Sequence, residues 1–396
     1  MSIRTTSGVL LALVLAVVAG GFVLLASNRG VEYFAAIPSS SASGQVASVA
    51  AFAPSSNATT SAASVAATSS LPRKKAAPKP AAALVQDTEV AAPSVPAPAS
   101  DGQDVYRVED PYPFAPQPVD TVNILTRSAL VNILCIPFSG SMNPVSGSGV
   151  IIDPRGVILT NAHVAQYILL AESSKVSLSC VIRTGAPAQA QWHAEVLYIP
   201  PVWVRAHAAD ITAQHPTGTG EHDYALLRIT DSISGAPLSA VPSLSFDTRE
   251  GVSFIDDEVL LAGYPAEFMG GMTTESALFP VTSTTKIKDM FTLQSSTVDV
   301  VSLGGVIQAQ GGSSGGAMVN AWNFLVGIIT TTSEGKTTAE RDLHALTLSY
   351  IDRDLRAQSG LGLKETLAGD VASEAATFSA QQAPALQQLL INQLRK

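Results

Sequence analysis

Residues 119–360 are predicted to form an all-β domain, because three features of this stretch agree. Short runs rich in β-branched and other apolar residues recur along it, and helical spacing of apolar residues is rare. Gly, Pro and Asp punctuate the runs, as in Asp153-Pro154-Arg155-Gly156, which has the composition of a tight turn. A stretch of roughly 240 residues is long enough for two small barrels that share a cleft.

The candidate strands fall into two groups, which place one barrel at about residues 119–235 and another at about 250–350. A helix is expected over residues 350–356. In the tail of residues 361–396, a second helix is expected to dock or to form an oligomer contact through four leucines at helical spacing, Leu386, Leu389, Leu390 and Leu394. The candidate strands are residues 129–138, 147–152, 156–160, 175–183, 194–199, 224–229, 258–263, 277–286, 291–300, 317–319, 324–331 and 345–349.

Residues 8–26 form an apolar run that contains no polar side chain. As a helix this run would span roughly 28 Å, close to the ~30 Å hydrocarbon thickness of a bilayer. We therefore expect residues 1–28 to be an N-terminal transmembrane anchor. Arg4 before the run, and Arg29 followed by Glu32 after it, weakly favour a chain that continues outside the cytoplasm. A cleaved signal peptide and a secreted protein are the alternative, although such an apolar region is usually only about 7–15 residues long.

Residues 29–118 are expected to be a disordered linker. The stretch 38–100 consists mainly of Ala, Ser, Pro, Thr and Val, and it buries too little apolar area to offset the entropy of ordering it. Its cluster Arg73-Lys74-Lys75 is interpreted as solvated linker charge rather than as a contact with anionic lipid. The net charge of −9 argues against broad binding of nucleic acid.

The run Gly-Gly-Ser-Ser-Gly-Gly at residues 311–316 has the composition of a nucleophile loop. A serine needs a base to take its proton, and the oxygen that becomes negative when a carbonyl is attacked needs amide donors. Gly312 can adopt a backbone conformation that turns its N–H inward, and Gly315 and Gly316 are expected to leave room for a substrate carbonyl. Ser314 is preferred to Ser313, because only Ser314 has glycine at positions −2, +1 and +2. The alternative is a glycine-rich turn with two hydrophilic serines.

His163 is the candidate base and Asp223 the candidate carboxylate that orients it. His163 follows a predicted strand at the start of a short helical turn, and its ordinary pKa near 6.5 suits proton transfer. Asp223 begins a predicted strand, where it can accept the second imidazole N–H. Asp210 is a competing candidate, but no strong strand follows it. His222 adjoins Asp223 and is expected to point to the opposite face of the strand.

With these residues in the order His, Asp, Ser, the chain resembles the chymotrypsin-like serine proteases, most closely the bacterial HtrA-type branch. The resemblance covers about residues 120–350. It implies a double six-stranded antiparallel β-barrel, peptide-bond hydrolysis through an acyl-enzyme without a cofactor, and an oxyanion hole at the N–H groups of Gly312 and Ser314. The segments that carry it are Gly-Ser-Gly-Val-Ile-Ile (147–152), Gly-Val-Ile-Leu-Thr-Asn-Ala-His-Val (156–164), Asp-Tyr-Ala-Leu-Leu (223–227), Gly-Tyr-Pro (263–265), Gly-Ser-Ser-Gly-Gly-Ala (312–317) and Val-Gly-Ile-Ile-Thr (326–330).

The chain departs from the HtrA-type pattern at three points. The interval from His163 to Asp223 is longer than usual, which implies an insertion at about residues 184–221. A peptide-binding PDZ module normally follows the protease domain, and residues 361–396 are too few for one, so the chaperone-like behaviour of the branch is not expected. Ser313 stands where relatives often have Asn or Asp, but it still supplies a backbone N–H, so an active enzyme is expected.

The insertion raises the question of a metal site. No cysteine joins its histidines, and their spacing matches no familiar ligand set, so we expect surface or strand-paired histidines and no metal. The residues concerned are His193, His207, His215 and His222, four of the six histidines in the chain.

Cys135 and Cys180 lie in two predicted strands on either side of the His163 segment. These two strands are neighbours in the resembled fold. That resemblance, together with an oxidising compartment outside the cytoplasm, implies a disulfide between the two cysteines. Two independent buried thiols are the alternative.

The function expected from these features is a membrane-anchored serine endopeptidase that acts on proteins or peptides outside the cytoplasm. A catalytically silent scaffold that binds envelope proteins or peptides is the main alternative, and an esterase would use the same residues. The resemblance places Gln308 near the floor of the primary specificity pocket. This residue lacks the carboxylate that trypsin uses, so cleavage after Lys or Arg is not expected.

Overall fold

The computed structural model describes residues 105–138, 142–213, 218–269, 271–293 and 297–395, all of which belong to one unit of the chain. The predicted membrane anchor, most of the predicted linker and His215 lie outside these residues. Within the described ranges, every helix is too short or too polar to cross a membrane.

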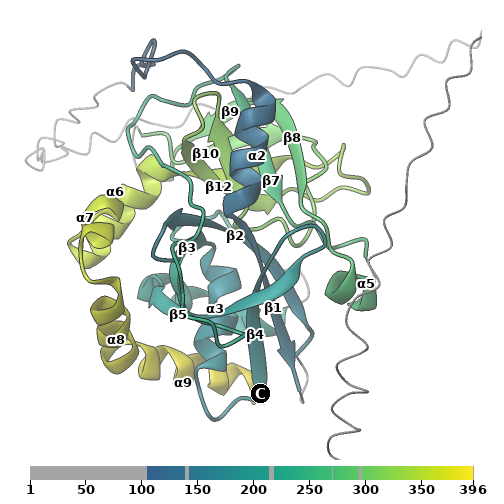
Figure 1. Cartoon of the computed structure of the whole chain (residues 1–396), viewed down its shortest axis with the longest axis vertical. Helices are drawn as coiled ribbons and strands as arrows, with labels where there is room; N and C mark the ends of the chain where they lie inside the picture. Colours follow the sequence, from purple (N-terminus) through teal and green to yellow (C-terminus); the bar gives the residue numbers. More distant parts are fainter. Residues whose placement is uncertain (1–104, 139–141, 214–217, 270, 294–296, 396) are drawn as a thin grey trace, which may run out of the picture. The chain divides into compact units, whose positions relative to one another are not determined.

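Six antiparallel strands close into a barrel in the order β1-β2-β3-β6-β5-β4 (Figure 1). The first predicted barrel is therefore confirmed. Strands β1 and β2 carry apolar runs that are buried over much of their length, and all four residues of β3 are buried. The strands are β1 (Leu130–Pro137), β2 (Val145–Asp153), β3 (Val157–Thr160), β4 (Leu178–Thr184), β5 (Gln189–Tyr198) and β6 (Ala225–Ser232).

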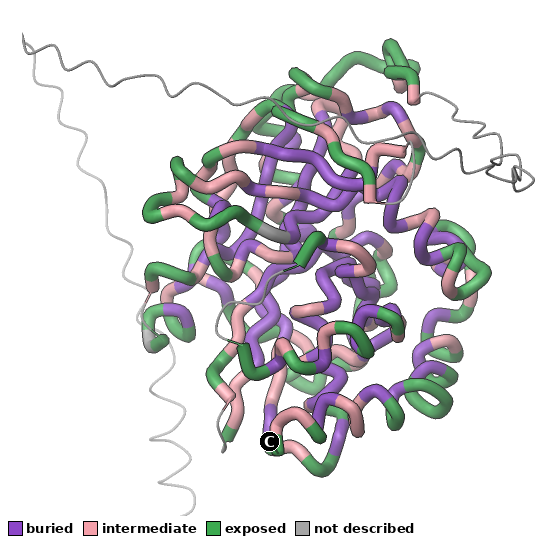
Figure 2. Tube along the Cα trace, turned by 180° about the vertical axis from the view of Figure 1, so that it is seen from behind, coloured by how far each residue is buried: buried purple, intermediate pink, exposed green. Residues whose placement is uncertain are grey.

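The second group of strands forms a seven-stranded sheet in the order β8-β7-β11-β12-β13-β10-β9, not the second closed six-stranded barrel that we predicted. The buried residues follow the strands of both sheets in Figure 2. Leu261, Val301, Met318 and Ala345 belong to the apolar core of this second sheet. Its strands are β7 (Glu258–Gly263), β8 (Val281–Lys286), β9 (Asp289–Phe291), β10 (Val300–Gly304), β11 (Ala317–Asn320), β12 (Leu325–Thr332) and β13 (Leu343–Thr347).

The difference in strand number has a local cause at residues 291–300, which we predicted to be one strand. Here β9 ends at Phe291 and β10 begins at Val300, and the two strands pair with each other. The buried carboxylate of Asp299 accepts hydrogen bonds from the backbone N–H of Leu293 and the hydroxyl of Thr297. The predicted single strand is therefore interrupted between Phe291 and Val300.

Helices are more frequent than predicted. The short helical turn expected after His163 is a full helix, α3, which is apolar on nearly all sides and largely buried. The predicted helix at 350–356 is confirmed as α6, which begins with a hydrogen bond to the side chain of Thr347 and ends at Gly360 with a positive φ of 84°. The helices are α2 (Val119–Ala129), α3 (Ala162–Ala171), α4 (Pro201–His207), the 3-10 helix η1 (Ala208–Thr212), α5 (Gly271–Ser276), α6 (Leu348–Ser359), α7 (Leu363–Ala368), α8 (Val371–Gln381) and α9 (Ala383–Leu394).

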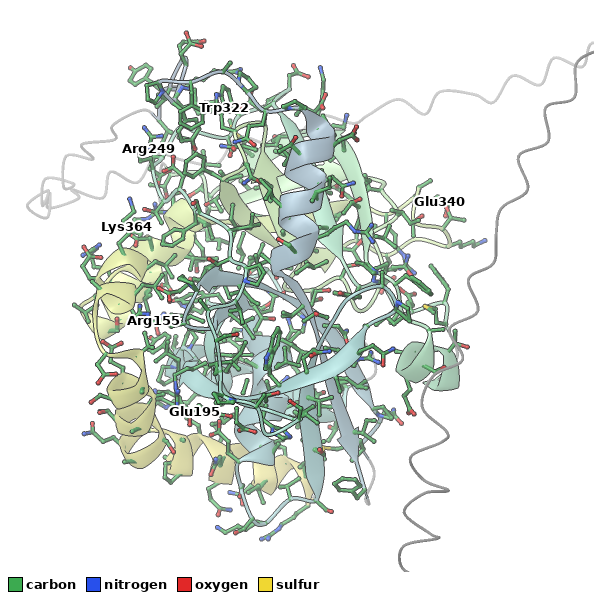
Figure 3. The ribbon with its side chains drawn as sticks, viewed as in Figure 1. Arg155, Glu195, Arg249, Trp322, Glu340 and Lys364 are labelled. Carbon is green, nitrogen blue, oxygen red and sulfur yellow. A yellow bond between two sulfur atoms is a disulfide. The ribbon has the colours of Figure 1, made fainter. Side chains whose placement is uncertain are left out.

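The C-terminal tail forms three helices instead of the single one predicted, and they lie along the six-stranded barrel (Figure 1). Helix α8 contacts β5, and α9 contacts α3, α4 and η1. Leu386, Leu390 and Ile391 of α9 are buried, so the predicted docking stripe is used within the domain. Arg155, labelled in Figure 3, donates to the carbonyls of Leu367 and Gly369 and ties the tail to the β2–β3 turn.

Residues 105–118 lie against the second sheet, so the disorder predicted for the linker does not extend to them. The ring of Tyr112 stacks on Phe324 with the ring centroids 4.4 Å apart, and the Arg249 guanidinium lies 5.2 Å from the Tyr112 ring centroid. The indole N–H of Trp322, labelled in Figure 3, donates to the carbonyl of Phe114 at 2.9 Å.

The predicted disulfide is confirmed. Strands β1 and β4 are antiparallel neighbours whose register places Cys135 directly opposite Cys180, and the two sulfur atoms are bonded. The bond therefore joins two strands that are already paired, and it closes a loop with a sequence separation of 45 residues around α3.

Removal of the disulfide is expected to destabilise the domain. Closing a loop of this length is worth about 4 kcal/mol in the chain-entropy treatment, because the bond restricts the unfolded chain. The double variant Cys135→Ala/Cys180→Ala should therefore unfold at a lower urea concentration than the oxidised wild type, and reduction of the wild type with dithiothreitol should lower its midpoint similarly. Equal urea midpoints for the variant and the oxidised protein would contradict the expected contribution.

Candidate active site

His163 and Asp223 are brought together by the pairing of β3 with β6. The register places Thr160 opposite Ala225, so the end of β3 and the start of β6 lie side by side. His163 Nδ1 lies 2.8 Å from Asp223 Oδ2, and the backbone N–H of His163 donates to Asp223 Oδ1 at 3.0 Å. Both oxygens of one carboxylate therefore fix the same histidine.

Asp223 has two further partners from different parts of the chain. The hydroxyl of Thr330 on β12 donates to Asp223 Oδ2 at 2.9 Å, and the side-chain amide of Asn161 donates to the Asp223 carbonyl at 2.8 Å. The Asp223 side chain is only 6% exposed, so the hydrogen bonds of Thr330 and His163 to its carboxylate compensate the cost of burying its charge. No role was predicted for Thr330 or Asn161, although both lie in the segments that carry the family resemblance.

The electrostatic environment favours a charged Asp223 and a histidine that binds a proton readily. Burial lowers the pKa of His163, but the negative charge and hydrogen bond of Asp223 outweigh it and raise this pKa above its ordinary value. Burial raises the pKa of Asp223, but His163 and the hydroxyl of Thr330 outweigh it and lower that pKa. A proton on Nδ1, shared with Asp223, leaves Nε2 of the neutral ring as an acceptor.

Ser314 is linked to this pair through Thr330. Its hydroxyl donates to the Thr330 carbonyl at 3.3 Å, while the Thr330 hydroxyl contacts Asp223. Both Ser314 and His163 are among the residues described, and no hydrogen bond joins their side chains in this conformation. Ser313 is buried, and its hydroxyl is buried without a hydrogen-bond partner, so Ser314 is the more accessible of the two serines.

Two backbone N–H groups beside Ser314 have no acceptor in the part of the chain that the structure describes: those of Gly312 and Ser314. The carbonyl of Gly311 accepts from the N–H groups of Ala266 and Glu267 at 2.8 and 3.2 Å, which fixes the peptide between Gly311 and Gly312. Because N–H and C=O point in opposite directions across a planar trans peptide, the Gly312 N–H points away from Ala266. Two unpaired donors on one loop can stabilise a negative oxygen.

The glycines around Ser314 are required by close packing of the backbone. A Cβ on Gly312 (φ 93°) would lie 2.6 Å from the Tyr264 carbonyl oxygen, and one on Gly315 (φ 82°) would lie 2.1 Å from that of Ser148. The space on the Cβ side of Gly315 is therefore filled by strand β2 and Thr160.

Ser148 on β2 fixes the serine loop and was given no role by the sequence analysis. Its N–H donates to the Ser314 carbonyl at 2.8 Å, and its hydroxyl donates to the Gly312 carbonyl at 2.7 Å. The hydroxyl also accepts from the N–H of Tyr264 at 2.8 Å. Its only signal in the sequence is its place between two glycines at residues 147–149.

The other candidate residues have hydrogen-bond partners of their own. Asp210 pairs with His207 at 2.8 Å, and His193 pairs with Asp231 at 2.8 Å. Gln308 is fully buried, and its side-chain amide bonds to Ser283 at 2.7 Å and to backbone carbonyls of β7 and β8. Across the described ranges, which exclude His215, no group of three metal-ligating side chains occurs.

A match to a protein family agrees with this geometry. Residues 147–328 match the family model of the trypsin-like peptidase domain, and this range contains His163, Asp223 and Ser314. No curated protein matches the chain.

Among solved structures, the chain is similar to a serine endoprotease from Yersinia pestis, with 19% identity over 63% of this chain and 70% of that one, at a TM-score of 0.39. It is also similar to the Rv3671c protease from M. tuberculosis, whose active form gives 18% identity over 69% of this chain and 95% of that one, at a TM-score of 0.39. The inactive form gives 16% identity over 62% and 98%, at a TM-score of 0.38. The predicted kinship with the trypsin-like proteases rests on the family match, and the chain contains a trypsin-like peptidase domain and is a serine endopeptidase.

Proposed function

We propose that the protein is a membrane-tethered endopeptidase that hydrolyses peptide bonds outside the cytoplasm through Ser314, His163 and Asp223. The observation that carries the proposal is the pair of hydrogen bonds between the Asp223 carboxylate and His163, one with the imidazole and one with the backbone N–H. Thr330 connects this pair to a serine that is flanked by two unpaired N–H groups. A base, an orienting carboxylate, a nucleophile and an oxyanion hole are thus available at one site.

In the first half of the reaction, Nε2 of His163 takes the Ser314 proton as Oγ forms a bond to the substrate carbonyl carbon. The carbonyl oxygen becomes negative and is bound by the N–H groups of Gly312 and Ser314. His163 then protonates the leaving amine, the C–N bond breaks and an acyl-enzyme remains. Water attacks the acyl-enzyme with His163 again as base, which releases the carboxylic acid and restores Ser314. Asp223 stays ionised throughout.

The Ser314 hydroxyl must turn from Thr330 towards His163 before it can react. Its contact with the Thr330 carbonyl is long for a hydrogen bond from a hydroxyl, at 3.3 Å, so little free energy is lost when it breaks. Hydrogen bonds of a catalytic serine are often loose before substrate binds and tighten in the complex.

The proposed location outside the cytoplasm is supported by two independent features. The apolar run at residues 8–26 has the length of a bilayer span, and the disulfide between Cys135 and Cys180 is the kind of bond that persists in oxidising compartments. The substrates proposed are proteins or peptides. Gln308 offers a neutral and already hydrogen-bonded amide, so we propose that the primary specificity pocket does not select Lys or Arg.

Replacement of Ser314 should abolish catalysis. We expect Ser314→Ala to lower kcat for casein-derived peptides by about 10⁴-fold or more, because the nucleophile is lost. The same variant should not be labelled by a fluorophosphonate. Ser313→Ala is the matched control and should keep both activities, since the Ser313 hydroxyl is buried without a partner.

Labelling of the Ser314→Ala protein would contradict the assignment of the nucleophile. A folded wild type that the fluorophosphonate does not label would instead favour the silent scaffold. Hydrolysis of ester substrates without cleavage of peptides would favour an esterase.

The pH dependence of the reaction should follow His163. The neutral imidazole is the active form, so kcat/KM is expected to fall as the pH drops through the raised pKa of His163. The midpoint of this fall, the acidic limb of the pH profile, should therefore lie at a pH above the ordinary pKa of histidine. Asp223→Asn removes the charge that raises this pKa, so the limb should move to lower pH while kcat falls by about 10⁴-fold. An acidic limb that stays in place in Asp223→Asn would show that another group controls it.

The apolar run should determine membrane attachment. The full chain, expressed in a bacterium, is expected in the membrane fraction after a carbonate wash, whereas a variant lacking residues 1–28 should be released. Replacement of Arg73, Lys74 and Lys75 by Ala is the control and should leave the full chain membrane-bound. Recovery of the full-length product in the medium, with a new N-terminus beyond the apolar run, would show signal cleavage instead.

A further inference from the structure

The backbone immediately before Asp223 is in an unusual conformation. The N–H of Asp223 donates to the Gly220 carbonyl at 3.0 Å and closes a tight turn, in which His222 has a positive φ of 59°. Turns with a positive φ at the third position strongly prefer Gly or Asn there, because a Cβ disfavours this conformation. His222 was expected to lie on a strand with its side chain opposite Asp223, but it belongs to this turn. Something other than the local sequence must therefore stabilise the turn.

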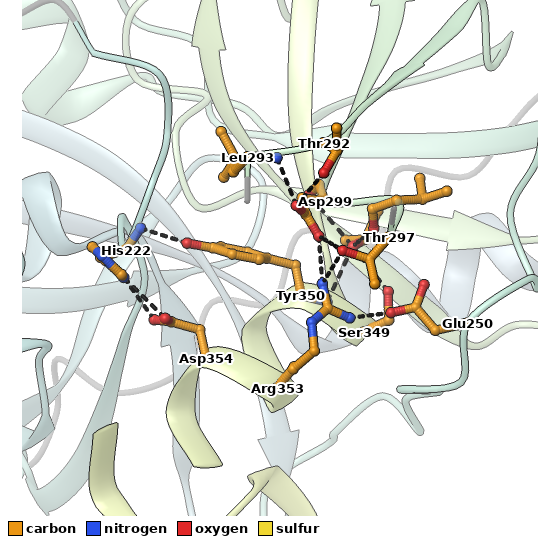
Figure 4. A network of polar contacts seen from close by, with 12 residues as sticks. His222, Glu250, Thr292, Leu293, Thr297, Asp299, Ser349, Tyr350, Arg353 and Asp354 are labelled. Atoms are coloured by element: carbon orange, nitrogen blue, oxygen red, sulfur yellow. Dashed lines mark hydrogen bonds and ion pairs between the residues drawn. The ribbon is translucent and has the colours of Figure 1, made fainter. Parts of the chain in front are cut away.

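Helix α6 supplies the missing stabilisation (Figure 4). The backbone N–H of His222 donates to the Tyr350 hydroxyl at 2.9 Å, and its Nδ1 lies 3.0 Å from both carboxylate oxygens of Asp354. The Asp354 side chain is 8% exposed and the His222 side chain 20%, so water screens this pair only partly. The other acidic group facing the ring is Glu221, 3.6 Å from Nε2.

Helix α6 is itself fixed on its other side. Arg353 pairs with Glu250 and with the buried carboxylate of Asp299, and it donates to the Thr297 hydroxyl at 3.0 Å (Figure 4). The Thr347 N–H at the start of the helix donates to the Asp299 carbonyl at 3.0 Å. A helix whose Arg353 is paired with a buried carboxylate can serve as a rigid support for the turn.

We propose that His222 and Asp354 are positioning residues that hold the turn at residues 220–223 and so present Asp223 to His163. This inference rests on the proposed catalytic role of Asp223. The contacts of His163 and Thr330 with the Asp223 carboxylate determine where this side chain points. The turn determines the position of the Asp223 backbone. Loss of the contact between His222 and Asp354 lets His222 relax towards a negative φ. This change in the turn displaces the carboxylate of Asp223.

The test compares His222→Ala, His222→Gly and Asp354→Ala in the full chain with a peptide substrate. We expect His222→Ala and Asp354→Ala to lower kcat by about 10-fold with little change in KM, because a small displacement of a catalytic group affects the chemical step. Their acidic limb of kcat/KM should move to lower pH, since a displaced Asp223 raises the pKa of His163 less. His222→Gly should retain more activity than His222→Ala, because glycine adopts a positive φ without a Cβ penalty.

A double-variant cycle separates positioning from a merely structural role. If His222 acts through Asp223, adding His222→Ala to Asp223→Asn should change kcat by less than about twofold. Arg356→Ala is the matched control: this residue lies on α6 and pairs with Glu365 at the surface, so kcat and the acidic limb should remain those of the wild type. Active enzyme is counted by fluorophosphonate titration, so that unfolded protein does not enter the rates.

The proposal is overturned if His222→Ala and Asp354→Ala keep the wild-type kcat and acidic limb. It is also overturned if kcat falls equally in His222→Ala and His222→Gly while the acidic limb stays in place. A third contradicting result is that His222→Ala lowers kcat as much in the Asp223→Asn background as in the wild type. A wild type that the fluorophosphonate does not label at Ser314 would overturn the proposed function itself, which is a separate result.

Discussion

The buried carboxylate of Asp223 is the group on which the rest of the site depends. A charge that is 6% exposed is tolerated only when it is hydrogen-bonded on all sides, and the chain supplies donors from separate elements. The imidazole and backbone N–H of His163 come from α3, beside the six-stranded barrel, and the hydroxyl of Thr330 comes from the seven-stranded sheet. The Asp223 carboxylate thus joins the barrel to the sheet. The same carboxylate raises the pKa of His163.

The serine loop is placed by backbone contacts instead of by side chains. Strand β2 meets the loop through Ser148, whose N–H and hydroxyl bind the carbonyls of Ser314 and Gly312. This approach is close enough that no side chain fits at Gly315. Glycine at position 315 is therefore a requirement of packing between the two halves of the domain. The unpaired N–H groups of Gly312 and Ser314 are a consequence of the loop geometry that this packing imposes.

Most of the fold and of the candidate site could be predicted from the sequence, because short-range patterns determine them. Strand β7 was predicted at its observed bounds, and the order of the motif segments identified His163, Asp223 and Ser314. Helix α2 could have been found, since Val122, Thr126 and Ala129 are buried at helical spacing.

The features that escaped prediction depend on contacts between distant parts of the chain. The strand predicted at residues 291–300 is interrupted next to Asp299, which pairs with Arg353, 54 residues away. The conformation of His222 depends on Asp354, 132 residues away, and a strand pattern read from neighbouring residues cannot contain that information. Such contacts exist only once the tertiary structure has formed, so local periodicity does not report them.

Two histidine–carboxylate pairs involve consecutive residues of the chain: His222 binds Asp354, and the next residue, Asp223, binds His163. The first pair stabilises a backbone conformation that its own sequence disfavours, and the second depends on the position of that backbone. Strained residues persist at functional sites when surrounding contacts determine their conformation, and here those contacts come from a helix that follows both sheets in the sequence. Docking of α6 is therefore a condition for the geometry of the site, so the site requires the C-terminal part of the described domain as well as the two sheets.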